Sequence, residues 1–365
     1  MSINEIIMYI MVIFAVLGAL DKIIGNKFGL GEKFEEGIMA IGALAISMVG
    51  IIALAPVLAE LLKPVIVPIF GFLGADPAMF AGSILANDMG GAPLAQALAI
   101  DPQAGLFGGL IVGSMLGPTI VFTIPVALGI IEESDRTYLA TGVLAGVIAV
   151  PFGSFVGGVV AGFPIMMVLR NLIPIIIFAV LIALGLWKFQ EAMVTGFTYF
   201  GKFVVAVIII GLAAGIVEQL LGIVLIPGMN PISEGFTVVA DIAIVLAGAF
   251  PLVYVITKVF KKPLLKLGKV LGMNDVAAAG LVASLANSIP MFGMMKDMDA
   301  RGKIINVAFA VCAAFVFGDH LGFTAGFNQE MIFPMIVGKL VGGIVGVLVA
   351  IFIANKTLGK SKGAA

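Results

Sequence analysis

The stretch Leu85-Ala86-Asn87-Asp88-Met89-Gly90-Gly91 divides an apolar segment, Asp76–Ile100, at its centre. A similar stretch, Leu285-Ala286-Asn287-Ser288-Ile289-Pro290, divides a second apolar segment, Asn274–Met295. Each half is roughly 8 to 12 residues long, which is too short to cross a bilayer as a helix. Each segment is therefore predicted to form a re-entrant hairpin, which enters the membrane and returns to the side from which it came.

The two divided segments belong to an internal repeat whose copies lie about 200 residues apart. The stretch Gly18-Ala19-Leu20-Asp21-Lys22-Ile23-Ile24-Gly25 returns as Gly215-Ile216-Val217-Glu218-Gln219-Leu220-Leu221-Gly222. Shorter pairs at nearly the same offset are Glu36-Gly37 with Glu234-Gly235, Lys63-Pro64 with Lys262-Pro263, and Phe122-Thr123 with Phe323-Thr324. The regular offset makes chance similarity a poor explanation, and inverted repeats around a central site are typical of transporters.

The rest of the chain has the composition of a membrane protein. Of its 365 residues, 61% are hydrophobic and 11% are charged, which is far from the usage in soluble domains. Apolar runs long enough to span a hydrocarbon core of about 30 Å predict nine spans beside the two hairpins: Ile3–Ile24, Gly37–Leu62, Gly105–Ile131, Tyr138–Gly162, Leu172–Trp187, Phe203–Ile226, Gly235–Ile256, Ile304–Phe327 and Met331–Ala354. No soluble domain is expected.

Lysine and arginine residues indicate the topology, because the cytoplasmic loops of membrane proteins are enriched in both. The second hairpin segment is preceded by one basic cluster and followed by another: Lys258, Lys261, Lys262, Lys266 and Lys269, then Lys296, Arg301 and Lys303. A hairpin keeps both clusters cytoplasmic, with the N-terminus outside and the C-terminus inside. Only Lys63 and Arg170 are then external, Lys339 lies within a span, and the two repeats are inverted. Eleven full spans remain an alternative.

The predicted fold is an all-α polytopic membrane protein built from two inverted repeats. Each repeat has four spans, a re-entrant hairpin and a broken helix, and a connecting helix joins the two repeats. Residues 1–162 form the first repeat, residues 163–200 the connecting segment, residues 201–355 the second repeat, and residues 356–365 a short basic cytoplasmic tail. The single cysteine, Cys312, excludes an internal disulfide and is expected to be a small core residue.

The hairpin tips are predicted to supply part of a substrate-binding site. In the inverted arrangement, Asn87 and Asp88 at one tip approach Asn287 and Ser288 at the other, near the middle of the membrane. Hairpin tips expose unpaired backbone groups, which are tolerated at that depth only against protein or a water-filled cavity. The alternative is that these side chains merely cap short helices.

The span that follows each hairpin is interrupted as well. The first interruption reads Gly117-Pro118-Thr119, and the second reads Gly318-Asp319-His320. An unwound helix leaves backbone groups free to line a site, and a carboxylate within a span is a functional candidate because burying it is costly. Further candidate residues for substrate binding are Thr119, Phe122, Asp319, His320, Phe323 and Thr324. For His320 and the two phenylalanines, packing within the helix bundle is the alternative.

The charged candidates suggest the class of ligand. Asp88 and Asp319 are candidate counter-charges for a cationic substrate or a proton, and Phe122 and Phe323 offer cation–π faces. Lys339 is expected to snorkel toward the membrane surface or to pair with a carboxylate. The sequence has no Walker motif and no Cys/His cluster, so we expect no direct use of ATP, no metal and no cofactor. Neither enzyme activity nor a nucleic-acid partner is expected.

These motifs resemble the ethanolamine-utilisation transport proteins of the EutH type. The similarity runs from Ile3-Asn4-Glu5-Ile6-Ile7-Met8-Tyr9-Ile10 to the C-terminal span. Its strongest passages are Phe34-Glu35-Glu36-Gly37, Met79-Phe80-Ala81-Gly82, Asp88-Met89-Gly90-Gly91, Gly113-Ser114-Met115-Leu116-Gly117-Pro118-Thr119-Ile120-Val121-Phe122 and Gly318-Asp319-His320-Leu321-Gly322-Phe323-Thr324-Ala325-Gly326.

The resemblance implies a bacterial cytoplasmic-membrane permease that supplies ethanolamine to a cytosolic degradation pathway. A small ammonium ion with a hydroxyl group suits a site of carboxylates, amides and hydroxyls. The alternatives are a carrier for another small amine or polar metabolite, and a membrane sensor that binds ethanolamine without transporting it. The absence of a signalling domain argues against the sensor. The sequence does not decide whether the protein forms a homodimer, or whether transport is coupled to protons or sodium.

Overall fold

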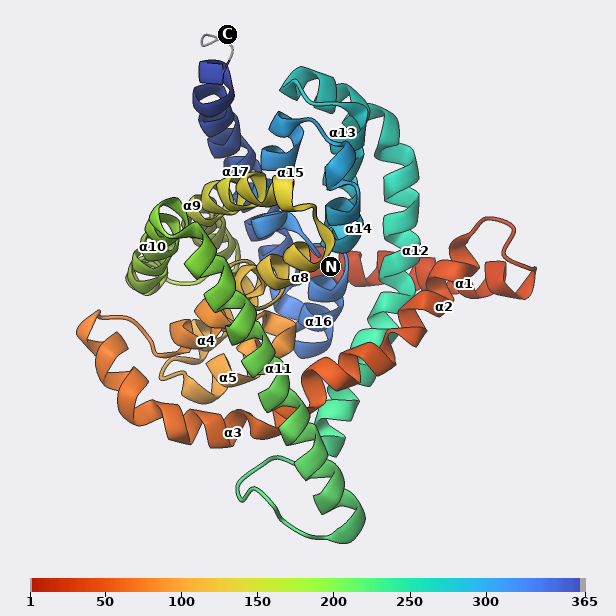
Figure 1. Ribbon diagram of the computed structural model, residues 1–365. Coiled ribbons are helices and arrows are strands. Elements are labelled where there is room, and N and C mark those ends of the chain that lie inside the picture. The colour runs from red at the N-terminus through yellow and green to blue at the C-terminus, as the bar shows by residue number, and fades with distance from the viewer. Residues whose placement is uncertain (1, 362–365) are drawn as a thin grey trace.

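The computed structural model describes residues 2–361, and within that range all side chains except those of residues 260–262, 264, 265, 267 and 358–361. The described part of the chain is helical and contains no strand (Figure 1). Its α-helices are α1 (Ile3–Ile23), α2 (Leu30–Met39), α3 (Ile41–Phe72), α4 (Ala78–Ile84), α5 (Gly91–Leu98), α6 (Pro102–Leu106), α7 (Leu116–Pro118), α8 (Ile124–Ile130), α9 (Arg136–Val160), α10 (Ile165–Lys188), α11 (Gln190–Leu221), α12 (Ile232–Leu271), α13 (Asp275–Ala286), α14 (Ser288–Gly293), α15 (Ala300–Ala313), α16 (Asp319–Phe327) and α17 (Ile332–Ser361).

The described residues include 7 helical segments that are long and apolar enough to cross a membrane. They are Ile3–Ile23, Leu30–Phe72, Glu133–Val160, Ile165–Lys188, Gln190–Leu221, Ile232–Val259 and Gln329–Thr357. An eighth candidate is the pair Pro102–Ser114 and Leu116–Ile130, which is bent by 41° at its break. The prediction of a polytopic all-α membrane protein is therefore confirmed.

The eighth predicted span, Ile304–Phe327, is divided into two separate helices. Helix α15 ends at Ala313, the chain turns over residues 314–318, and α16 begins at Asp319. Each of these helices alone is shorter than the roughly 20 residues that a span needs. The interruption predicted at Gly318 is thus present, whereas the count of nine spans stays a prediction.

Several helices extend beyond the predicted bounds. Helix α12 continues to Leu271 through the first basic cluster, so part of the predicted loop is helical. The predicted boundary at residue 200 falls inside α11, and α17 runs to Ser361 through most of the predicted tail. The side chains of Lys261 and Lys262, and residues 362–365 of the tail, lie outside the described residues.

Each divided apolar segment folds back on itself. In the first, the carboxylate of Asp76 accepts hydrogen bonds from the backbone N–H groups of Ile100 at 3.0 Å and Asp101 at 2.9 Å. In the second, the backbone N–H of Asn274 donates to Asp299 at 2.8 Å. The start of each segment therefore lies beside its end. The re-entrant hairpins and the alternative of eleven full spans both stay predictions.

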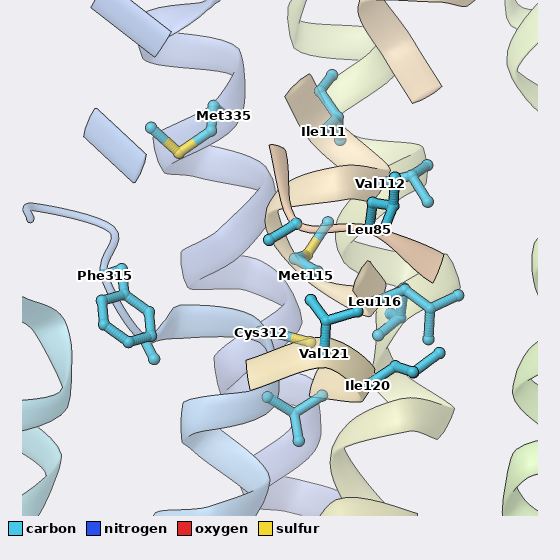
Figure 2. Packing of buried hydrophobic residues seen from close by; sticks show 14 of the residues in the cluster. Leu85, Ile111, Val112, Met115, Leu116, Ile120, Val121, Cys312, Phe315 and Met335 are labelled. Atoms are coloured by element: carbon cyan, nitrogen blue, oxygen red, sulfur yellow. The ribbon is translucent and has the colours of Figure 1, made fainter. Parts of the chain in front are cut away.

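The short helices lie inside a frame of long ones. Figure 1 shows α4, α5, α8 and α16 near the centre of the molecule, with α3, α10 and α12 around them. Figure 2 shows how tightly this centre is packed: Leu85 lies among residues of the first broken helix such as Val112 and Leu116. Cys312 belongs to the same buried cluster, as predicted.

Two contacts fix how the long helices cross. A Cβ atom added to Gly37 would stand 2.5 Å from the backbone nitrogen of Ala247, and one added to Gly235 would stand 3.0 Å from the Cα of Val49. Along α2–α3, Gly37 precedes Val49, whereas their partners on α12 follow in the opposite order, Ala247 and then Gly235. These two segments therefore run antiparallel to each other.

Candidate functional site

Each hairpin tip lies against the broken helix that follows it. A Cβ atom on Gly117 would stand 1.8 Å from the carbonyl oxygen of Leu85, and one on Gly318 would stand 2.1 Å from that of Ala286. In the second copy, the backbone N–H groups of Phe315 and Phe317 also donate to carbonyl oxygens at the end of α13, at 3.0 and 2.9 Å. Only glycine permits so close an approach, so these glycines position the tips.

The first broken helix departs from α-helical geometry on both sides of its break. One π-helical turn spans Phe107–Ile111, and another spans Thr119–Thr123. Such turns leave carbonyl groups without their usual helical partners and are frequent at functional sites. Here the carbonyl of Ser114, just before the break, accepts a hydrogen bond from the ammonium of Lys339 on α17.

Lys339 therefore lies at the candidate site and does not snorkel to the membrane surface, which was the first of the two expectations for it; pairing with a carboxylate was the second. Its side chain is only 1% exposed, and its Nζ atom lies 3.0 Å from Nδ1 of His320. With Lys339 as an ammonium group, which can only donate, Nδ1 is the acceptor, and the imidazole is then neutral with its proton on Nε2. Nε2 faces Asp88, with Oδ1 of that carboxylate at 3.9 Å.

The second carboxylate, Asp319, is the first residue of α16 and is half-buried. Helix α16 packs against the turn Asn87–Met89, which carries Asp88, so the two carboxylates lie on neighbouring elements. Among the described residues, the side chain of Asp319 has no hydrogen-bond or ion-pair partner. A carboxylate within a span that lacks an internal partner is available to a cation.

Three predicted site residues carry buried polar atoms without any hydrogen-bond partner in the described structure. They are Asn87, through both Nδ2 and Oδ1, Ser288, through Oγ, and Thr324, through Oγ1. Leaving a buried polar group unpaired costs about 1–3 kcal/mol, so such atoms usually have a ligand or a water molecule as their partner. Their side chains can both donate and accept.

Two other predicted residues are explained by local structure. The side chain of Asn287 accepts a hydrogen bond from the backbone N–H of Ile289 at 2.8 Å and caps α14, so the capping alternative holds for this residue. The hydroxyl of Thr119 donates to the carbonyl of Met115 at 2.8 Å. Neither contact by itself indicates a ligand.

The predicted aromatic residues pack against other rings. Phe323 is fully buried and stacks on Phe327 at a centroid distance of 5.3 Å. Phe122 meets Phe315 edge to face at 5.5 Å. Phe315 in turn lies 5.2 Å from the ring of His320, with its backbone at a φ of 63°, which is strained for a bulky residue.

Lys339, Ser114 and Phe315 thus lie at the candidate site, although the sequence analysis did not select them. For Lys339 a signal existed, because a lysine inside an apolar span is rare and usually functional. Ser114 contributes a backbone carbonyl, and Phe315 contributes a strained backbone and a ring contact. Neither feature depends on a recognisable residue pattern.

The chain was compared with known proteins. It matches the profile of the family described as "Ethanolamine utilisation protein, EutH" over residues 3–353. It is 68% identical to a "Probable ethanolamine permease EutH" of Listeria monocytogenes, over 99% of this chain and 97% of the relative. A protein of the same name from Escherichia coli K12 is 54% identical, over 92% of this chain and 91% of the relative. No solved structure matches. A match over nearly the whole chain means that this protein belongs to the EutH family of ethanolamine utilisation proteins.

Proposed function

We propose that this protein is a permease, not an enzyme, that carries ethanolamine across the bacterial cytoplasmic membrane as a secondary transporter or facilitator. The observation that carries the proposal is the 68% identity, over almost the full length of both chains, to a relative named as a probable ethanolamine permease. The buried centre of the molecule supports it independently, because that centre combines carboxylates with unpartnered amide and hydroxyl groups.

The chemistry of the site suits an ammonium ion that carries a hydroxyl group. Asp319 binds the ammonium group, since its carboxylate has no partner among the described residues. The unpartnered atoms of Asn87, Ser288 and Thr324 can exchange hydrogen bonds with the ammonium and hydroxyl groups. A hydrogen bond to a charged group contributes about 1.5–3 kcal/mol, so a few of them suffice for specific binding.

The proposed mechanism is alternating access between two inverted repeats. Gly235 corresponds to Gly37 in the repeat, and by the same offset Ala247 corresponds to Val49. The contacts Gly37 to Ala247 and Gly235 to Val49 are therefore one contact made twice with the partners exchanged. Because equivalent helices run antiparallel, this pattern supports a two-fold axis parallel to the membrane, as in transporters with inverted repeats.

In this arrangement the two divided segments are re-entrant hairpins that enter from opposite sides of the membrane. The chain crosses nine times, with α6–α8 and α15–α16 as broken spans, the N-terminus outside and the C-terminus inside. The positions of the basic clusters support this orientation.

A pocket supports an access path from the outside. It has a volume of about 340 Å³ and is lined by residues of α3, α5, α12 and the end of α16, including Pro56, Gln96 and Phe327. Phe327 stacks on Phe323, which precedes Thr324 in α16. In the proposed topology the pocket residues lie in the outer half of the protein, and the pocket is the proposed outer part of the path.

Binding by the purified protein tests the proposed substrate. Titration calorimetry should show saturable binding of ethanolamine, and about tenfold weaker binding of ethylamine, which lacks one hydrogen-bonding group worth about 1–1.5 kcal/mol. Ethylene glycol, which lacks the charge, should not bind measurably. A folded protein that does not bind ethanolamine but binds another small amine would establish the alternative carrier function.

A further inference from the structure

Lys339 supplies a buried positive charge that the proposed function has not used. Its side chain is 1% exposed, and its ammonium contacts the carbonyl of Ser114 and Nδ1 of His320. A lysine in this position costs free energy unless its charge is compensated. Its location on α17, against both a broken helix and the candidate site, places that charge beside the substrate.

The carboxylate of Asp88 compensates the charge of Lys339, and His320 lies between the two groups. The neutral imidazole accepts from Lys339 at Nδ1, and its protonated Nε2 faces Asp88 at 3.9 Å. Asp319 begins α16, which packs against the turn that carries Asp88. Asp88 is thus already matched by a cation within the protein.

A count of formal charges follows from these contacts. Two carboxylates and one ammonium give the site one negative charge in excess, and Asp319 is the carboxylate without a partner among the described residues. We propose that Lys339 is a specificity-determining residue. Its ammonium group balances the charge of Asp88 through His320, so that Asp319 is left to bind one ammonium group of the ligand. This inference rests on the proposed function, since it concerns the same site and the same class of ligand.

The arrangement selects monovalent amines against divalent ones. A diamine of similar size would bring a second ammonium toward a site where the charge of Asp88 is already balanced by Lys339 through His320. Juxtaposing like charges suppresses wrong partners. Selection of this kind needs no steric difference between the ligands.

Two ligands of equal length allow the effect of ligand charge on binding to be measured apart from the effect of ligand shape. 3-Amino-1-propanol is monovalent and 1,3-diaminopropane is divalent at neutral pH, and they differ only in the terminal hydroxyl or amino group. The measurement is the ratio of their dissociation constants for the wild type, for Lys339→Met and for the double variant Lys339→Met/Asp88→Asn. Lys339→Arg, which keeps the charge, serves as the control.

The wild type and Lys339→Arg should prefer the amino alcohol. Lys339→Met should shift the ratio toward the diamine by at least about tenfold, since one charge-assisted interaction contributes about 1.5–3 kcal/mol. The double variant, which restores one net negative charge, should restore the preference for the amino alcohol. If Lys339 had a purely structural role, Lys339→Met would weaken the binding of both ligands equally, and adding Asp88→Asn would not restore it.

The inference and the proposed function fail in different ways. Equal binding of the two ligands by the wild type, or an unchanged ratio in folded Lys339→Met, overturns the role of Lys339 while ethanolamine binding stands. Absence of ethanolamine binding in the folded wild type overturns the proposed function and the inference with it. If Lys339→Met does not fold, Lys339→Gln and the double variant carry the same comparison.

Discussion

Gly318 lies directly on the carbonyl oxygen of Ala286, so that the second broken helix meets the tip of the second hairpin without a side chain between them. Gly117 and Leu85 repeat this relationship in the first half of the chain. Both contacts join the two kinds of interrupted element that carry the candidate site residues. The geometry of the site therefore depends on two positions that have no functional group of their own.

Substituting Gly318 with alanine should destabilise the protein. The added Cβ atom would stand 2.1 Å from a backbone oxygen, and overpacking of this kind costs about 1–3 kcal/mol. Thermal unfolding in detergent should show a lowered midpoint for Gly318→Ala. Gly293→Ala is the matched control, because a Cβ there meets nothing within 4 Å. Equal midpoints for the two variants would contradict the proposed packing.

Neutralising Asp319 should weaken ethanolamine binding by at least about tenfold, because the ammonium loses its charged partner. Glu36→Gln is the control, since Glu36 is exposed and forms an ion pair with Lys33 within one helical turn. Such a surface pair contributes little, so binding by this variant should stay close to that of the wild type. Calorimetric titration of both variants provides the measurement. Wild-type affinity in folded Asp319→Asn would remove Asp319 from the site.

Asn87 should matter for binding and not for stability. Both polar atoms of its side chain are buried without a partner, so Asn87→Ala removes groups whose burial is costly. The unfolding midpoint of Asn87→Ala should match or exceed that of the wild type, while ethanolamine binding weakens.

A second buried asparagine supplies the comparison for Asn87. The side chain of Asn306 donates to the carbonyls of Ala277 at 2.8 Å and Gly302 at 2.9 Å. Asn306→Ala should therefore lower the unfolding midpoint. If Asn87→Ala destabilises the protein as much as Asn306→Ala does, then Asn87 has a structural partner and its proposed role is wrong.

The interrupted elements could be predicted from the sequence because their signals are local. Glycine, proline and polar residues within otherwise apolar segments mark the tips at Asn87 and Asn287 and the break at Gly318. The ends of α12 could not be predicted in this way, since lysine favours helices and the helix continues past the apolar run.

Contacts between distant residues were harder to predict than breaks. Lys339 and Ser114 are far apart in the sequence, and they meet only because α17 passes the break in the first broken helix. The positive φ of Phe315 is a second example, because the surrounding packing imposes it on a residue that disfavours it. Asn287 is different, because its contact with Ile289 is local and its capping role was the alternative that the sequence offered.

Uptake of labelled ethanolamine by the purified protein in liposomes tests transport most directly. The wild type should show saturable uptake above that of empty liposomes, which measure passive leak of the neutral amine, and Asp319→Asn should not exceed that leak. Folded wild-type protein that binds ethanolamine without any uptake above empty liposomes would contradict a transport function and favour a sensor.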